Sequence, residues 1–228
     1  MNFSPIWISM KTASAAIVIT FFLGLFTARW IVKIKSERVK IILDGLLTLP
    51  LVLPPTVMGF FILFLFGVKR PLGKILLQFL SVKIVFSWTA TVIAAVIISY
   101  PLMYRSARGA FEQVNQNLIA AARTLGMSER KIFWHVTMPL ALPGVASGGV
   151  LAFARGLGEF GATAMIAGNI ENKTRTLPMA IYSEVAAGNM DAAKDYVLIV
   201  LAISFVIIIL MNYFTLTGRK FLNKEKIK

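Results

Sequence analysis

The chain has 228 residues, of which 57% are hydrophobic, and it carries a formal net charge of +14. This apolar share exceeds the roughly 45–50% that is typical of soluble globular domains. The chain has no cysteine, which excludes disulfides and thiol nucleophiles, and its single histidine, His135, argues against a histidine-based metal site or catalytic triad. The basic residues flank long apolar runs, which indicates a membrane topology rather than nucleic-acid binding.

Five apolar segments are long enough to cross the roughly 30 Å hydrocarbon core of a bilayer as helices. They predict an all-α polytopic membrane protein with about five transmembrane helices. The second segment contains Pro54 and Pro55, which would break a lipid-facing helix and are expected where neighbouring helices satisfy the freed carbonyls. The five segments are Trp7–Val32, Ile41–Phe66, Val85–Met103, Leu140–Leu157 and Tyr196–Leu216.

The orientation follows from the basic residues in the connections. Fifteen lysines and arginines fall in the stretches 29–40, 105–131 and 219–228, which share one side of the membrane. Seven fall in the stretches 69–83 and 173–194 on the other side. Because cytoplasmic loops carry the excess of lysine and arginine, we expect the N-terminus outside and the C-terminus inside.

Two connections are too long to be simple turns. Residues 104–139 form a cytoplasmic segment of mixed polarity, and residues 158–195 form an external one. The glycine-rich stretch Gly161–Ile170 can be a half-helix or a re-entrant element, which is tolerated only where protein or water covers its backbone. Whether residues 158–190 contain an extra span is left open by the sequence.

The cytoplasmic segment reads as a helical hairpin. Asn117–Leu125 is rich in helix formers, Gly126 can end that helix in a left-handed conformation, and Ser128 can cap the next helix. We expect Pro139 to end the second helix. A hairpin this short is not stable alone, so it must pack on its own spans or on a partner.

The hairpin resembles the EAA loop of ABC importer permeases. The matching residues are Ala120 to Gly126 and, after nine intervening residues, Val136 to Pro139. The chain departs from the pattern at Ala120, which stands where the family has glutamate, so any ion pair of that glutamate with the ATPase is absent here. The resemblance implies that the hairpin docks on an ATPase subunit, and the coupling residues it indicates are Ala121, Ala122, Arg123, Gly126, Phe133 and Pro139.

Three further stretches resemble molybdate permeases in particular. They are residues 50–59, 152–163 and, in two pieces, 167–170 with 174–182; sulfate/thiosulfate permeases share the Leu157–Ala162 element. The likeness covers about residues 10–216 and implies a single transmembrane permease domain, 1–228, with the type I ABC importer permease fold. It implies a multi-pass protein of a prokaryotic cytoplasmic membrane that translocates molybdate, with tungstate or sulfate/thiosulfate as alternative anions.

The energy source and the partners follow from the same resemblance. The nearest approach to a phosphate-binding loop has the wrong glycine spacing and Ile75 where serine or threonine is required, so the chain itself holds no ATP. The resemblance implies two copies of an ATP-binding subunit that binds ATP and magnesium, an external molybdate-binding protein and a second copy of the chain, all in a lipid bilayer and without nucleic acid. An enzyme is disfavoured, and a stand-alone secondary transporter is the weaker alternative, because no internal repeat and no second carboxylate at membrane depth is present.

The fourth segment carries two patterns. Four small residues at every fourth position indicate close helix packing, with a pore-lining role as the alternative, and they are Gly144, Gly148, Ala152 and Gly156. Arg155 and Glu159 are spaced to pair on one helix face, either as a structural ion pair or as a gate that helps an oxyanion pass. With Thr163 they are the pathway candidates; the sequence indicates neither a metal site nor a tight substrate site.

Overall fold

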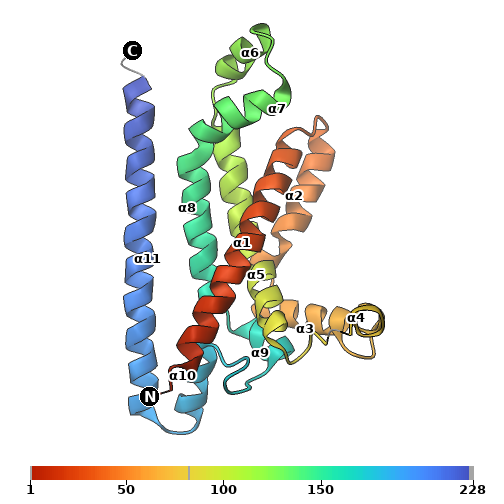
Figure 1. Cartoon of the computed structure of the whole chain (residues 1–228). Helices are drawn as coiled ribbons and strands as arrows, with labels where there is room; N and C mark the ends of the chain where they lie inside the picture. Colours follow the sequence, from red (N-terminus) through yellow and green to blue (C-terminus); the bar gives the residue numbers. More distant parts are fainter. Residues whose placement is uncertain (1, 82, 226–228) are drawn as a thin grey trace.

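The computed structural model describes residues 2–81 and 83–225, and these residues form helices and loops without any strand. Four helical segments are long and apolar enough to cross a membrane: α1 (Ser4–Val32), α5 (Trp88–Glu112), the segment Glu129–Leu157 that includes α8 (Met138–Leu157), and Met190–Tyr213 of α11 (Met190–Glu225). They run roughly side by side in Figure 1. Four of the five predicted spans are therefore confirmed as straight helices.

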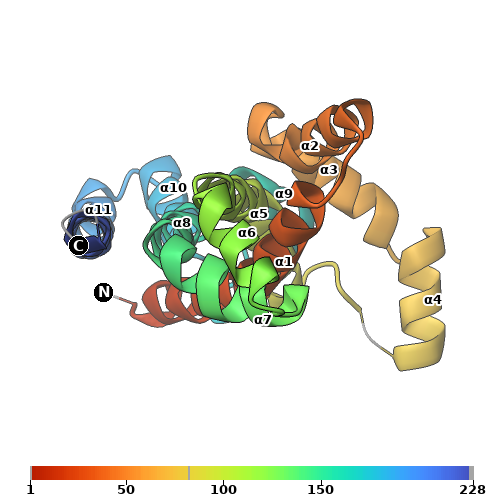
Figure 2. The same cartoon turned by 90° about the horizontal axis from the view of Figure 1, so that it is seen from above.

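The second predicted span is wrong as a continuous helix. It consists of α2 (Glu37–Val52) and α3 (Pro55–Phe66), which are bent by 109° at the break between them. Leu53 is extended, as expected of a residue before proline, and Pro54 and Pro55 bring no backbone N–H to continue the helix. Helix α3 therefore turns across the bundle and continues into α4 (Pro71–Leu80), which also lies crosswise (Figures 1 and 2).

Helix α5 is the centre of the molecule. It packs against α1 and α8 and also contacts α2 and α9 (Gly161–Ala167). Small residues allow the close approach: a Cβ added to Gly24 of α1 would lie 2.7 Å from Cγ of Met103 in α5. Without a hydrophobic force between helices in lipid, such small-residue contacts carry much of the packing.

The start of α1 and the end of α11 lie at opposite ends of the bundle, as Figure 1 shows. The turn between α1 and α2, the hairpin of α6 (Gln116–Thr124) and α7 (Glu129–Ile132), and the C-terminal end of α11 share one end. The other end holds the N-terminus, α9 and α10 (Leu177–Ala186). This is the grouping that the charge asymmetry predicts, and by that asymmetry we expect the hairpin end to be the cytoplasmic end.

The connection between α8 and α11, residues 158–189, contains no further span. Gly161–Ile170 was expected to be a half-helix or a re-entrant element, and α9 is a helix of 7 residues that ends at Gly168. Helix α10 has 10 residues and lies beside α11. Both are far shorter than the roughly 20 residues that a span requires.

The expectation that Pro139 ends the second hairpin helix is wrong. Helix α7 continues through a π-helical turn, Phe133–Thr137, directly into α8, so that Glu129–Leu157 forms one long helical segment. The N–H of Met138 donates to the carbonyl of Phe133, five residues earlier. Pro139 then occupies the first turn of α8, a position where its missing N–H and fixed φ are tolerated.

Candidate functional site

The α6–α7 hairpin is closed by local hydrogen bonds that its sequence provides. The Asn115 side chain accepts from the N–H of Asn117 at 2.9 Å and caps α6. Gly126 has φ of +76°, and the next residue, Met127, donates its N–H to the Ala122 carbonyl at 3.1 Å. The Ser128 hydroxyl accepts from Lys131 N–H at 3.4 Å and caps α7. The predicted left-handed glycine and serine cap are both confirmed.

Aromatic packing fixes the hairpin on the bundle. The buried Phe133 ring lies 5.5 Å from the ring of Phe111 at the end of α5, in an edge-on arrangement. The guanidinium carbon of Arg29, near the end of α1, stands 3.7 Å above the centre of the same Phe133 ring. Edge-on aromatic pairs and cations over rings are both favourable. The hairpin is therefore anchored to α1 and α5 through Phe133.

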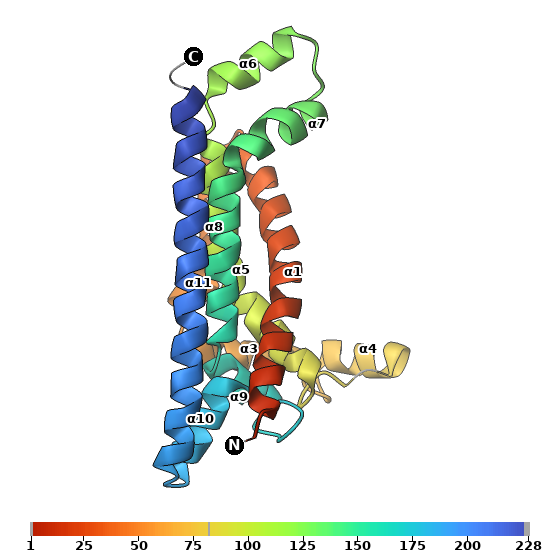
Figure 3. The ribbon, with the colours of Figure 1, turned by 60° about the vertical axis from the view of Figure 1, so that its left-hand side comes forward.

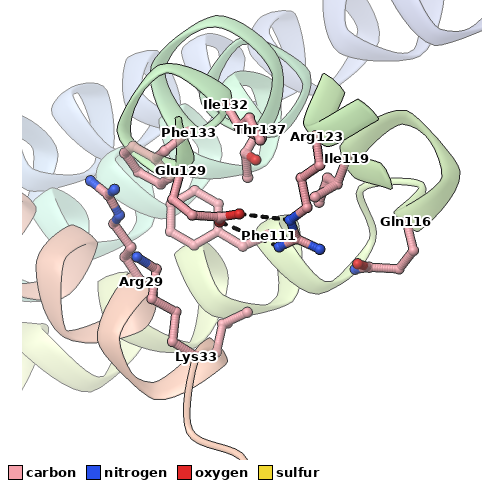
Figure 4. Close-up of a pocket in the computed structure, with 11 residues that line it drawn as sticks. Arg29, Lys33, Phe111, Gln116, Ile119, Arg123, Glu129, Ile132, Phe133 and Thr137 are labelled. Carbon is pink, nitrogen blue, oxygen red and sulfur yellow. Dashed lines mark hydrogen bonds and ion pairs between the residues drawn. The ribbon is translucent and has the colours of Figure 1, made fainter. Parts of the chain in front are cut away.

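A cavity of about 400 Å³ lies between the hairpin and the ends of α1 and α5 (Figure 4). Arg29, Lys33 and Arg123 line it together with a single carboxylate, that of Glu129. Glu129 Oε1 accepts from Arg123 Nε at 2.6 Å, a pair that joins α7 to α6. This hydrogen bond raises the pKa of the Arg123 guanidinium, which stays charged at any physiological pH.

The outer surface of the hairpin carries exposed apolar side chains. Leu125, at the turn, is 82% exposed, and Leu118 and Trp134 are also exposed. Ala122 and Ile132 point inward and are buried. Leu125, at the tip of a hairpin whose other face is anchored, is therefore free to contact another protein.

The four small residues of α8 lie on the side that faces α5. A Cβ added to Gly144 would lie 2.8 Å from the Cβ of Ala110, and one added to Gly148 would collide with Ser106. Ala152 is buried, and Gly156 has looser contacts, 3.8 Å from the Cβ of Ala95.

The three pathway candidates lie together at the outer end of α8. Arg155 Nη1 donates to Glu159 Oε2 at 3.0 Å, and the other Glu159 oxygen accepts from the N–H of Ala162 in α9 at 2.8 Å. Glu159 is 2% exposed, whereas the side chain of Arg155 is 31% exposed. Thr163 is buried in α9. Glu159 thus connects α8 to α9, and α9 in turn packs on α3.

Sequence comparison decides the family. A family described as "Binding-protein-dependent transport system inner membrane component" matches residues 20–217. The chain belongs to this family.

Relatives within the family carry names related to molybdenum. ModB, the molybdenum transport system permease protein of Escherichia coli (strain K12), is 38% identical over 220 residues, 96% of each chain. The putative molybdenum transport system permease protein YvgM of Bacillus subtilis (strain 168) is 38% identical over 206 residues, 90% of each chain.

Solved ABC transporters share the fold. An inward-facing structure of the MetNI methionine ABC transporter matches with a TM-score of 0.72 at 14% identity, over 94% of each chain. A bacterial ABC transporter that imports alginate matches with a TM-score of 0.75 at 12% identity, over 96% of this chain and 79% of that one. The chain therefore has the type I ABC importer permease fold that the sequence predicted.

The structure places the sequence-predicted coupling residues in different environments. Ala121 is exposed, Ala122 is buried, and Arg123 is exposed and paired with Glu129. Gly126 forms the turn, Phe133 is the anchor, and Pro139 lies at the start of α8 rather than in the hairpin. Sequence reasoning missed Arg29 and Phe111, because they reach the hairpin only through the packing of distant helices. It also missed Glu129, which lies in the hairpin itself and pairs with Arg123 six positions earlier.

Proposed function

We propose that this chain is the membrane-spanning subunit of an ABC importer that moves molybdate into the cell with ATP hydrolysed by a separate subunit. The proposal rests on two findings taken together. The α6–α7 hairpin is anchored on the bundle, and relatives that match nearly the full chain are named as molybdenum transport permeases. The choice of molybdate over tungstate or sulfate rests on those names. The chain would work in a prokaryotic cytoplasmic membrane and would bind no ATP or magnesium itself.

The hairpin is built to pass a movement from an ATPase to the membrane helices. Its exposed face, with Leu125 at the turn, would enter a cleft on the ATPase, while Phe133 holds the other face on the bundle. Helix α6 follows α5 after three residues, and α7 runs into α8 without interruption. A displacement of the hairpin would therefore move α5 and α8 together.

The remaining partners complete the transporter. Two copies of the chain related by a two-fold axis, two ATPase subunits and an external molybdate-binding protein would form the assembly. The packing of Gly144, Gly148, Ala152 and Gly156 would hold α8 on α5 as these helices move.

The anion pathway would pass the outer end of α8. There Arg155 presents a partly exposed guanidinium, and Glu159 and Thr163 set the position of α9. A dianion would be attracted by Arg155, and a weak, transient contact would let it leave again. The pathway role of these three residues is part of the proposal.

Gly126→Val tests the coupling role. A β-branched residue at φ of +76° is strained by roughly 1–2 kcal/mol, so the turn should deform and molybdate-stimulated ATP hydrolysis should fall to its basal rate. The measurement uses proteoliposomes containing the chain with its ATPase and binding protein. Gly126→Asn is the matched control, because asparagine tolerates the left-handed region, and it should retain stimulation.

A cross-linking experiment tests the docking role of the hairpin without relying on backbone strain at Gly126. Because the chain lacks cysteine, Leu125→Cys introduces a unique thiol at the hairpin turn. We expect this thiol, when it carries a photoreactive or thiol-reactive reagent, to become cross-linked to the ATPase. Cross-linking only to lipid or to the chain itself, together with full stimulation in Gly126→Val, would refute the docking role.

A further inference from the structure

Helix α4 projects sideways from the bundle. It contacts α3 and lies across the direction of the straight spans, seen end-on in Figure 1 and lengthwise in Figures 2 and 3. In Figure 3 it extends beyond α1, away from the other helices. A helix in this orientation lies parallel to the plane of the membrane.

Most side chains of α4 are divided between an apolar and a polar side, and Leu77, 40% exposed, is an apolar residue on the polar side. Leu72, Ile75 and Phe79 recur at helical spacing, and all three are exposed, Phe79 by 81%. Lys74 lies about 140° around the helix from Phe79, at 3.6 residues per turn. Leu76 turns inward against the buried cluster around Ile62. An exposed apolar edge beside a basic one is the pattern of helices that lie at a membrane surface.

The charge around α4 has a single sign. Residues 67–83 contain Lys69, Arg70, Lys74 and Lys83 and neither aspartate nor glutamate. These four cations suit the phosphates of lipid headgroups. They do not suit a contact of α4 with α4 across a two-fold axis, which would place the same cations against one another.

The position of α4 along the length of the bundle also fits the lipid headgroup layer. It lies level with the start of α5 in Figures 1 and 3. That start is Trp88, and Lys11 Nζ stands 4.2 Å above the Trp88 ring. Tryptophan and lysine gather where the hydrocarbon core meets water, so α4 is at the boundary of the outer leaflet.

We propose that α4 is an interfacial helix that binds the lipid headgroup layer of the outer leaflet. Ile75 and Phe79 insert among the upper acyl chains, and the basic residues contact lipid phosphates. This role does not depend on which substrate the protein carries. It would hold the crosswise end of α3 at a fixed depth in the bilayer while the other helices move.

Fluorescence quenching tests the proposal directly. Phe79→Cys and Lys74→Cys are each labelled with an environment-sensitive thiol dye in the otherwise cysteine-free chain, in the assembled transporter in vesicles of phosphatidylglycerol and phosphatidylcholine. We expect blue-shifted emission from position 79 and several-fold stronger quenching there by lipid with a nitroxide high on the acyl chain. Position 74 should instead be quenched several-fold more strongly by iodide in the water. Ile75→Cys repeats the apolar side if one labelled variant fails to assemble.

Two results would overturn the proposal. Strong iodide quenching at positions 75 and 79 would mean that the apolar edge faces water. Protection of both positions from iodide and from nitroxide lipid would mean that protein covers them. Oxidative cross-linking of Phe79→Cys would then identify a second copy, and protection that appears only with the binding protein would identify that partner.

Discussion

Two parts of the molecule pack side by side but are held by different contacts. Helices α1, α5 and α8 form a bundle in which α5 buries residues along its whole length. Helices α2, α3 and α4 form an arm, and none of the residues of α2, all of which the structure describes, is buried. The bundle is closed by small residues in steric contact, whereas α2 is attached to α5 by ionic side chains and by the partly buried Leu43 and Leu47. Apolar composition alone therefore does not decide which helix belongs to the core.

The polar attachments of α2 can be named. Arg108 of α5 pairs with Asp44 of α2, and Tyr104 donates to the same Asp44 oxygen at 2.9 Å. Lys40 pairs with Glu112 at 2.9 Å. At the outer end α3 packs closely on α9, where a Cβ on Gly59 would lie 2.8 Å from the Cα of Ala162.

The largest expected effect is at the joint between bundle and arm. Arg155→Met removes the cation that pairs with the buried Glu159, and stranding a buried charge costs about 3–5 kcal/mol. We expect a clear loss of thermal stability in detergent and increased protease cleavage near α9. The double variant Arg155→Met/Glu159→Gln leaves no stranded charge and keeps an acceptor for Ala162 N–H, so its stability should recover.

The double variant also separates structure from transport. If the double variant is stable but does not transport molybdate, while Glu159→Gln alone does, Arg155 acts on the anion as proposed. Wild-type transport in the stable double variant would limit Arg155 to holding Glu159.

The second largest expected effect on stability comes from comparing a glycine of the bundle with a glycine of the arm. Gly148→Leu forces a side chain into Ser106 of α5, and overpacking of this kind costs about 1–3 kcal/mol. Gly45→Leu in α2 is the matched change, because no described atom lies within 4 Å of its added Cβ. We expect a lowered melting temperature only for Gly148→Leu. Equal losses in both variants would contradict the distinction between bundle and arm.

The ionic attachment should contribute less. Asp44→Asn removes the charge that Arg108 and Tyr104 share, and because the pair is partly exposed we expect a loss of about 1 kcal/mol. Hydrogen exchange should rise in α2 and not in α1. Glu37→Gln, at an exposed position in the first turn of the same helix, is the control and should leave exchange unchanged.

The smallest effect concerns the polar contacts within the bundle. Thr20→Val removes a buried hydrogen bond of 3.2 Å with Ser99 but keeps the size of the side chain. Interhelical hydrogen bonds in membranes contribute about 0.6 kcal/mol on average, so the shift in unfolding free energy should be near that value. A loss as large as that of Gly148→Leu would show that polar contacts, rather than steric fit, hold α1 on α5.

The sequence was sufficient to predict features that depend on residues close together in the chain. Gly126 and Ser128 end and begin the hairpin helices through bonds to residues within a few positions, so their roles could be predicted. The four straight spans follow from composition. The resemblance to a known family added the fold, which composition cannot provide.

The rest depends on contacts between distant residues. The effect of Pro54 and Pro55 depends on what packs against the chain after them. Here α3 is bent by 109° from α2 and packs on α9, which no periodicity in the sequence reveals. The sequence predicted only a basic external loop at residues 69–83, where the structure has helix α4. The Asp44–Arg108 pair joins residues 64 positions apart, and neither has a local signal of the other.

The π-helical turn Phe133–Thr137 separates the hairpin from the membrane-spanning part of α8. A π turn is an α-helix with one residue inserted, and each helical residue rotates the chain by about 100° around the axis. Deleting one residue there would restore a regular α-helix without shortening α8. The wide π turn absorbs the rotation of its extra residue locally, so after the deletion Phe133 would still face Phe111 and Arg29. The π turn can thus lose one residue while the hairpin keeps its direction, whereas the loss of one residue from a regular α-helix would rotate everything before it by about 100°.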